Sequence, residues 1–206
     1  MGRSPSGASC RLIVFCRPAD TRARPEQTHE GEVITTRSNI RWRADGVQLT
    51  RWNGEIVRGA FIPGAPDREI IAWRVVVNAG ISAGDVRDMM PEAVAGRFGG
   101  FRAPHQIEML SDNGSPYIAG QTRIFAGQLG LKPCLTPVKS PQSNGILEAF
   151  VKTLKRDCVQ ISPLPDAKTA LGLIAAWIKD DTESHPHSGL KMRSPRKVIA
   201  AQTATV

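Results

Sequence analysis

The spacing of hydrophobic residues along this chain changes near Ser82, and the change limits the folds that the chain can adopt. Between residues 47 and 62, apolar and polar residues alternate in two runs on either side of an Asn-Gly pair typical of hairpins. Residues 69–77 form a third run, rich in β-branched and aromatic residues, so we predict three antiparallel strands. From Ser82 onward apolar residues recur at helical intervals, and Ser82 with Asp85 has the spacing of a capping box. A helix is therefore predicted directly after the strands.

The rest of the chain is predicted to alternate between short strands and helices. Residues 107–110 and 132–135 have the apolar character of strands, and the helix between them is predicted to turn Ile118 inward. Further helices are predicted over 146–156 and 166–180. Three antiparallel strands followed by alternating helices and strands indicate an α/β fold, in which helices flank a mixed sheet.

Composition excludes several classes of protein. With 206 residues, 41% of them hydrophobic and 22% charged, the chain has the make-up of a globular protein and not of a disordered one. No apolar run approaches the roughly 18–20 residues that span a bilayer, so we expect no contact with a membrane. The cysteines show neither a C-x-x-C pair nor histidines at zinc spacing, as in proteins of a reducing compartment. We therefore expect a cytoplasmic protein.

Positive charge is concentrated towards the two ends of the chain, which has a net charge of +8. Residues 1–43 contain eight arginines against four acidic residues, and residues 132–197 contain eleven Lys and Arg against six acidic residues. Residues 44–131 are close to neutral. This distribution favours a polyanionic partner such as nucleic acid. Ordinary solvated surface charge is the alternative that composition leaves open.

Three acidic residues stand where packing does not account for them. Asp112 follows the strand predicted at 107–110, Asp45 lies within the first strand pattern, and Glu148 lies in the first turn of a helix. Magnesium ions that serve phosphoryl chemistry are held by a few carboxylates from separate elements and keep bound water. Each acid also has an explanation that involves no function. Asp112 fits an Asx turn, Asp45 fits a solvent-facing position on an edge strand, and Glu148 fits a surface acid favoured by the helix dipole.

The helix predicted over 146–156 combines an acid with basic residues on one side. Glu148, Lys152 and Lys155 are separated by four and three positions and lie opposite an apolar stripe. A Glu–Lys pair at this spacing stabilises a helix by about 0.2–0.5 kcal/mol, which explains the pattern without any function. A carboxylate at a metal ion with lysines gripping DNA phosphates explains it equally well, and both explanations can hold.

Three segments, 111–115, 140–157 and 185–196, resemble one known family. They are similar to the bacterial insertion-sequence transposases (OrfB type) of the retroviral-integrase, or DDE, superfamily. Between Asp112 and Glu148 lie 35 residues, which is the D-D-35-E arrangement of that family. The resemblance implies an RNase H-like fold, a mixed sheet of three antiparallel strands plus two further strands flanked by helices.

The resemblance also implies a division of the chain and a set of catalytic acids. The expected parts are a flexible or degenerate leader (1–38), an integrase-type catalytic core (39–182) and a basic C-terminal tail (183–206). The implied catalytic and metal-binding residues are Asp45, Asp112 and Glu148. They would bind two Mg²⁺ ions, with Mn²⁺ able to substitute. Asp67 is the competing candidate for the first acid.

The activity implied by the resemblance is metal-dependent DNA strand cleavage and strand transfer. The expected partners are element ends and target DNA, with a homo-oligomer as the active form. The residues expected to contact DNA are Lys139, Asn144, Lys152, Lys155 and Arg156, and those expected to position loops are Asn113, Gly114 and Gly145.

Two further interpretations concern the departures from the family and the histidines. The leader is unlike the family, and the aspartate that often ends the family's second strand is replaced near Pro63-Gly64. An inactive, truncated remnant that binds DNA non-specifically without catalysis is therefore the alternative function. His185 and His187 lack the further ligands that zinc needs, so we interpret them as surface or DNA-facing residues.

Overall fold

The computed structural model describes residues 37–50, 55–135, 150, 152–153 and 167–203. Its centre is a five-stranded sheet with the order β3-β2-β1-β4-β5. The strands are β1 (Arg41–Thr50), β2 (Ile56–Pro63), β3 (Ile70–Val77), β4 (Ile107–Ser111) and β5 (Leu131–Leu135). The first three strands pair antiparallel, whereas β4 pairs parallel with both β1 and β5. The mixed α/β sheet predicted from the sequence is confirmed.

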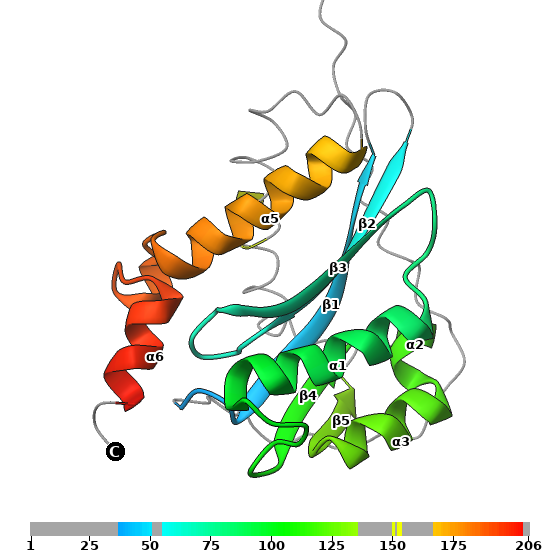
Figure 1. Cartoon of the computed structure of the whole chain (residues 1–206), viewed down its shortest axis with the longest axis horizontal. Helices are drawn as coiled ribbons and strands as arrows, with labels where there is room; N and C mark the ends of the chain where they lie inside the picture. The colour runs from blue at the N-terminus through cyan, green and yellow to red at the C-terminus, as the bar shows by residue number, and fades with distance from the viewer. Residues whose placement is uncertain (1–36, 51–54, 136–149, 151, 154–166, 204–206) are drawn as a thin grey trace, which may run out of the picture.

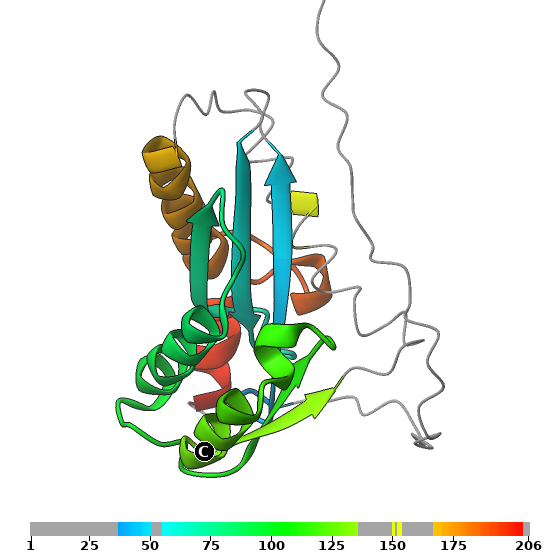
Figure 2. The ribbon, with the colours of Figure 1, turned by 90° about the vertical axis from the view of Figure 1, so that its right-hand side faces the viewer.

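Helices cover both faces of this sheet, with α1 and α5 on opposite sides (Figures 1 and 2). The helices are α1 (Ala83–Phe98), α2 (Ser115–Ile118), α3 (Gly120–Gln128), α5 (Ala167–Glu183) and α6 (Pro195–Thr203), with a 3₁₀ turn at Ser188–Leu190. None of the helices in the described ranges is long and apolar enough to cross a membrane.

The larger core lies between α1 and the sheet. Alternate residues of β1, Trp42 and Ala44, are buried there against one face of α1. The buried residues of α1 are Val86, Met89, Met90, Ala93 and Val94, as the helical spacing predicted. The predicted capping box is also present, because the Asp85 N–H donates to Ser82 Oγ at 3.1 Å and the Ser82 N–H donates to Asp85 Oδ2 at 2.8 Å.

The opposite face of the sheet carries a smaller core. Phe61 and Ile70 pack there against Ile174 and Ile178 of α5, and Phe150 contacts the same cluster. Two neighbouring residues of β2, Phe61 and Ile62, thus serve different cores because successive side chains of a strand point to opposite faces.

One predicted helix is broken in the structure. Ile118 was expected to face inward, but it is 38% exposed, so that expectation is wrong. The backbone of Ala119 is extended (φ −55°, ψ 132°), which separates α2 from α3 and interrupts the apolar stripe. Thr122 and Ala126 are the buried residues of α3.

The segment expected as a basic C-terminal tail contains helix α6. This helix is tied to the core by the ion pair between Arg196 and Glu69 and by the Ser38 N–H, which donates to Gln202 Oε1 at 3.0 Å. The leader up to residue 36, the Asn-Gly turn at 53–54 and most of the helix predicted over 146–156 lie outside the described residues.

Candidate active site

Asp45 and Asp112 lie side by side because each follows the same register pair of two parallel strands. Ala44 of β1 pairs with Ser111, the last residue of β4, and the residue that follows each of them in the chain is an aspartate. Adjacent strands are about 4.8 Å apart, so parallel pairing brings the two carboxylates to one place. β1 is a central strand, which excludes the edge-strand explanation for Asp45.

The two carboxylates influence each other electrostatically. The pKa of Asp45 is raised to about 6, mainly by burial and to a smaller extent by the negative charge of Asp112, while a hydrogen bond from Gly46 lowers it. In that bond the Gly46 N–H donates to Asp45 Oδ1 at 2.7 Å. The fold holds the two acidic groups close together although their negative charges repel each other. A cation bound between them would offset this repulsion.

A tight turn after β4 sets the direction of the Asp112 side chain. The Gly114 N–H donates to Asp112 Oδ1 at 3.0 Å, which is an Asx turn. A Cβ atom at position 114 would lie only 2.8 Å from that oxygen, so glycine permits the approach. The Asx turn that the sequence offered as the non-functional explanation for Asp112 is therefore present. The same turn also orients the Asp112 carboxylate.

Tyr117 of α2 belongs to this site, and the sequence analysis missed it. Its hydroxyl is buried and has no hydrogen-bond partner among the residues that the structure describes. Burial raises the Tyr117 pKa, and the charges of Asp45 and Asp112 raise it further. Two features of the sequence could have drawn attention to this residue: Tyr117 is the only tyrosine of the chain, and it follows Asp112 by five positions.

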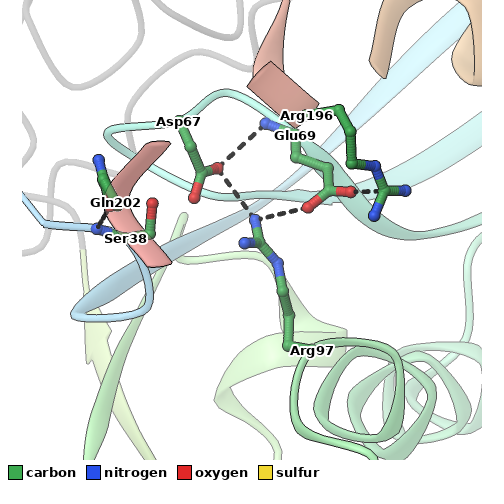
Figure 3. Close-up of polar contacts among 6 residues, drawn as sticks. All are labelled: Ser38, Asp67, Glu69, Arg97, Arg196 and Gln202. Carbon is green, nitrogen blue, oxygen red and sulfur yellow. Dashed lines mark hydrogen bonds and ion pairs between the residues drawn. The ribbon is translucent and has the colours of Figure 1, made fainter. Parts of the chain in front are cut away.

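Asp67, the competing candidate for the first metal-binding acid, belongs to a buried ion-pair network with Arg97. Its side chain is fully buried, and Asp67 Oδ1 accepts hydrogen bonds from Arg97 Nη2 at 3.0 Å and from the Glu69 N–H at 3.1 Å (Figure 3). Glu69 also pairs with Arg97, at 3.0 Å, and with Arg196, at 3.3 Å. This network ties the β2–β3 connection to the end of α1 and to α6.

The β2–β3 connection meets the other end of β1. The Ala65 N–H donates to the carbonyl of Arg41 at 3.0 Å, whereas Asp45 lies four residues further along the strand. The structure therefore brings Asp45, and not Asp67, to the side of Asp112.

Glu148 lies outside the described residues, but Phe150, two positions later, is described. The Phe150 ring lies 5.1 Å from that of Phe61 and 5.3 Å from that of Trp177, measured between ring centroids. Phe61 is the cross-strand partner of Asp45, and directly opposed residues of two strands project from the same face. Phe150 thus packs on the face of the sheet from which Asp45 projects.

The histidines of the C-terminal segment are more buried than we expected. His187 Nε2 lies 3.3 Å from Oδ1 of the buried Asp181, and the rings of His185 and His187 are in edge contact at 5.7 Å. Both line a cavity of about 240 Å³ together with Phe150. Both histidines have intermediate exposure, with His187 held beside the buried Asp181, and their interpretation as surface or DNA-facing residues stays a prediction.

The other residues singled out in the sequence are placed only in part. Asn113 and Lys152 are exposed. Lys139, Asn144, Gly145, Lys155 and Arg156 lie outside the described residues. In the part of the chain that the structure describes, no group of three or more His, Cys, Asp or Glu side chains is arranged to hold a metal ion. Of the three acids expected to bind metal, the structure brings Asp45 and Asp112 together, and Glu148 lies outside the described residues.

The sheet order and its flanking helices define an integrase core of the RNase H-like class. The catalytic core domain of BIV integrase matches this fold with a TM-score of 0.56 at 16% identity, over 81% of this chain and 97% of that chain. A chain of the simian T-cell lymphotropic virus intasome matches with a TM-score of 0.61 at 14% identity, over 85% and 60%. The integrase core domain family matches residues 129–195.

Proteins with similar sequences show to which family the chain belongs. The insertion element IS136 uncharacterized protein of Agrobacterium fabrum is 62% identical over 183 residues, which cover 89% of this chain and 94% of that protein. The putative transposase InsD for insertion element IS2E of Escherichia coli is 44% identical over 174 residues, covering 84% and 79%. The chain belongs to the bacterial insertion-element transposases with an integrase core. This family serves DNA transposition, and its members generally are DNA-binding, multimeric polynucleotidyl transferases that use divalent metal ions.

Proposed function

We propose that this protein cleaves DNA strands and joins them to target DNA, with Asp45, Asp112 and Glu148 as the ligands of two divalent metal ions. The observation that carries the proposal is the placement of Asp45 and Asp112 directly after Ala44 and Ser111, which are register partners in the adjacent parallel strands β1 and β4. Phe150 supports the inclusion of Glu148, because it packs on the sheet face from which Asp45 projects.

The donor set fits Mg²⁺ and accepts Mn²⁺. Carboxylate oxygens are the ligands that Mg²⁺ prefers, and a site with few protein ligands leaves positions for water and phosphate oxygens. The raised pKa of Asp45 supports the fit, since part of its cause is the neighbouring charge of Asp112, which a cation would neutralise. When bound, the ions would supply activation of water or of a 3′-hydroxyl and stabilisation of the leaving oxygen.

Other tasks in the proposed reaction, orientation of the carboxylates and contact with DNA, fall to side chains and turns of the protein. Asp45 lies within a central strand and accepts a hydrogen bond from Gly46, and Asp112 accepts one from Gly114, so both carboxylates are oriented before substrate arrives. Lys152 is exposed two residues after Phe150, a position from which it would contact DNA phosphates. We assign the same role to Lys139, Asn144, Lys155 and Arg156, and loop positioning to Asn113, Gly114 and Gly145.

The partners and the location follow from the reaction. The protein would bind element ends and target DNA and act as a homo-oligomer in the bacterial cytoplasm, where its DNA substrate is found. The proposed catalytic unit is residues 39–182, preceded by the leader and followed by the basic C-terminal segment.

Nicking of supercoiled plasmid by the full chain, with Mg²⁺ or Mn²⁺, tests the proposal. We expect Asp112→Asn to lower nicking at least 100-fold, because it removes one ligand charge. The matched control is Asp88→Asn, which makes the same chemical change at an exposed position of α1 and is expected to nick like the unaltered protein. Equal nicking by the unaltered protein and Asp112→Asn would remove Asp112 from the mechanism. DNA binding without nicking at any metal concentration would instead favour the inactive remnant.

A further inference from the structure

The hydroxyl of Tyr117 is a buried polar group that none of the described residues satisfies. It has no hydrogen-bond partner among the described residues, although the Tyr117 ring packs against the larger core. A buried hydroxyl without a partner costs about 1–3 kcal/mol, so a phenylalanine would pack here at lower cost. An unsatisfied group of this kind requires an explanation, and a partner that binds at the site is one.

The position of Tyr117 indicates which site its hydroxyl serves. A Cβ atom added at Gly114 would lie 2.8 Å from Asp112 Oδ1 and 3.4 Å from Tyr117 Cδ2, so the carboxylate and the ring lie on the same side of Gly114. The charges of both Asp45 and Asp112 act on the Tyr117 hydroxyl. The ring therefore lies close to the place where the two carboxylates meet.

The backbone around Tyr117 keeps the ring in this place. The Tyr117 N–H donates to the carbonyl of Gly114 at 3.0 Å, which closes the first turn of α2 directly on the Asp112 turn. Helix α2 also packs against α1 and α3, and these contacts fix its direction. The backbone of Tyr117 is thus anchored directly beside the Asp112 turn.

We propose that Tyr117 is a positioning residue of the metal site, whose hydroxyl donates a hydrogen bond within the outer shell of the bound ions. This inference rests on the proposed function, since it assumes that Asp45 and Asp112 bind a cation. The hydroxyl would orient an oxygen of the ligand set and find there the acceptor that the described part of the chain does not offer it. Loss of an outer-shell partner typically weakens metal affinity about 10–100-fold.

The test is Mn²⁺ binding to the full chain, measured by electron paramagnetic resonance, for the unaltered protein, Tyr117→Phe and Asp112→Asn. Thermal unfolding without metal is measured alongside. For Tyr117→Phe we expect Mn²⁺ binding about 10-fold weaker, with an unfolding temperature equal to or above that of the unaltered protein. A purely structural role for Tyr117 would leave Mn²⁺ affinity unchanged.

The outcomes separate the two proposals. Weaker binding by Tyr117→Phe together with an unimpaired fold supports the positioning role. Equal Mn²⁺ affinity of Tyr117→Phe and the unaltered protein overturns that role and leaves the proposed function standing, provided that Asp112→Asn binds more weakly. Absence of Mn²⁺ binding by the unaltered protein overturns the metal site, and the role of Tyr117 with it.

Discussion

The ring of Phe150 meets that of Phe61 edge to face, with 5.1 Å between the centroids and 62° between the planes. Phe61 is the cross-strand partner of Asp45, so this contact links the segment that follows Glu148 to the strand that carries the first acid. Trp177 of α5 lies against the other side of the same cluster, 5.3 Å from Phe150. An aromatic anchor therefore connects the proposed catalytic residues to the sheet and to α5.

Removal of this anchor is expected to impair the metal site. Phe150→Ala deletes both ring contacts, so the segment near Glu148 loses its attachment to β2, and we expect at least 10-fold weaker plasmid nicking and Mn²⁺ binding. The protein should also lose about 1–3 kcal/mol of stability. The matched control is Phe101→Ala, because the Phe101 side chain is 91% exposed and should affect neither quantity. Equal losses in the two variants would show that the anchor has no part in the site.

Asp45 is expected to make the stability of the metal-free protein depend on pH. Its pKa is about 6 in the fold against 3.8 for the unperturbed group, so the folded protein binds a proton more tightly than the unfolded chain does. Its stabilising contribution is complete below about pH 4 and is lost as the pH rises through about 6, a change of about 2–3 kcal/mol.

Asp45→Asn, which is neutral at every pH, should remove this part of the pH dependence and stabilise the metal-free protein above pH 7. Urea unfolding between pH 4.5 and 8 measures the effect, with Asp88→Asn as the exposed counterpart. Parallel stability profiles for Asp45→Asn and the unaltered protein would contradict the prediction. Since a metal competes with the proton on Asp45, Mn²⁺ affinity should also fall below about pH 6.

Gly114→Ala is expected to damage the site more than the fold. The added Cβ would lie 2.8 Å from Asp112 Oδ1, and the side chain of Asp112 can rotate away at little cost, so its carboxylate leaves the position beside Asp45. We expect Mn²⁺ binding to weaken at least 10-fold while unfolding shifts by about 1 kcal/mol or less. Gly127→Ala is the control: no atom lies within 4 Å of a Cβ there, and alanine should stabilise α3 by about 0.5–1 kcal/mol. Unaltered Mn²⁺ affinity in Gly114→Ala would contradict the role of the turn.

Asp67→Asn is expected to lower stability without affecting metal binding. The variant weakens the buried ion pair with Arg97, in which the Asp67 side chain is 0% exposed and the Arg97 side chain 6% exposed. We expect the free energy of unfolding to fall by about 3–5 kcal/mol. Arg74→Ala, which breaks an exposed pair with Glu92, should cost less than about 1 kcal/mol. Thermal unfolding and Mn²⁺ affinity distinguish the roles: a folded Asp67→Asn protein that no longer binds Mn²⁺ would make Asp67 the first metal ligand in place of Asp45.

Local patterns were sufficient to predict much of the fold. The alternation that predicted β1 and β2, the helical spacing that predicted α1 and the capping box of Ser82 and Asp85 all depend on residues a few positions apart, and the two strands, the helix and the capping box are present in the structure. The inward position of Ile118 was predicted wrongly because the extended backbone at Ala119 ends α2, which spacing alone does not show.

The candidate site depended on contacts between distant parts of the chain. The sequence left both Asp45 and Asp67 open as the first acid, and only the parallel register of β1 with β4 places Asp45 beside Asp112. The buried hydroxyl of Tyr117 likewise could not be predicted, because burial results from the packing of α2 on the rest of the fold. Secondary structure follows from short-range spacing and capping, whereas the meeting of two carboxylates 67 positions apart depends on which strands become neighbours in the sheet.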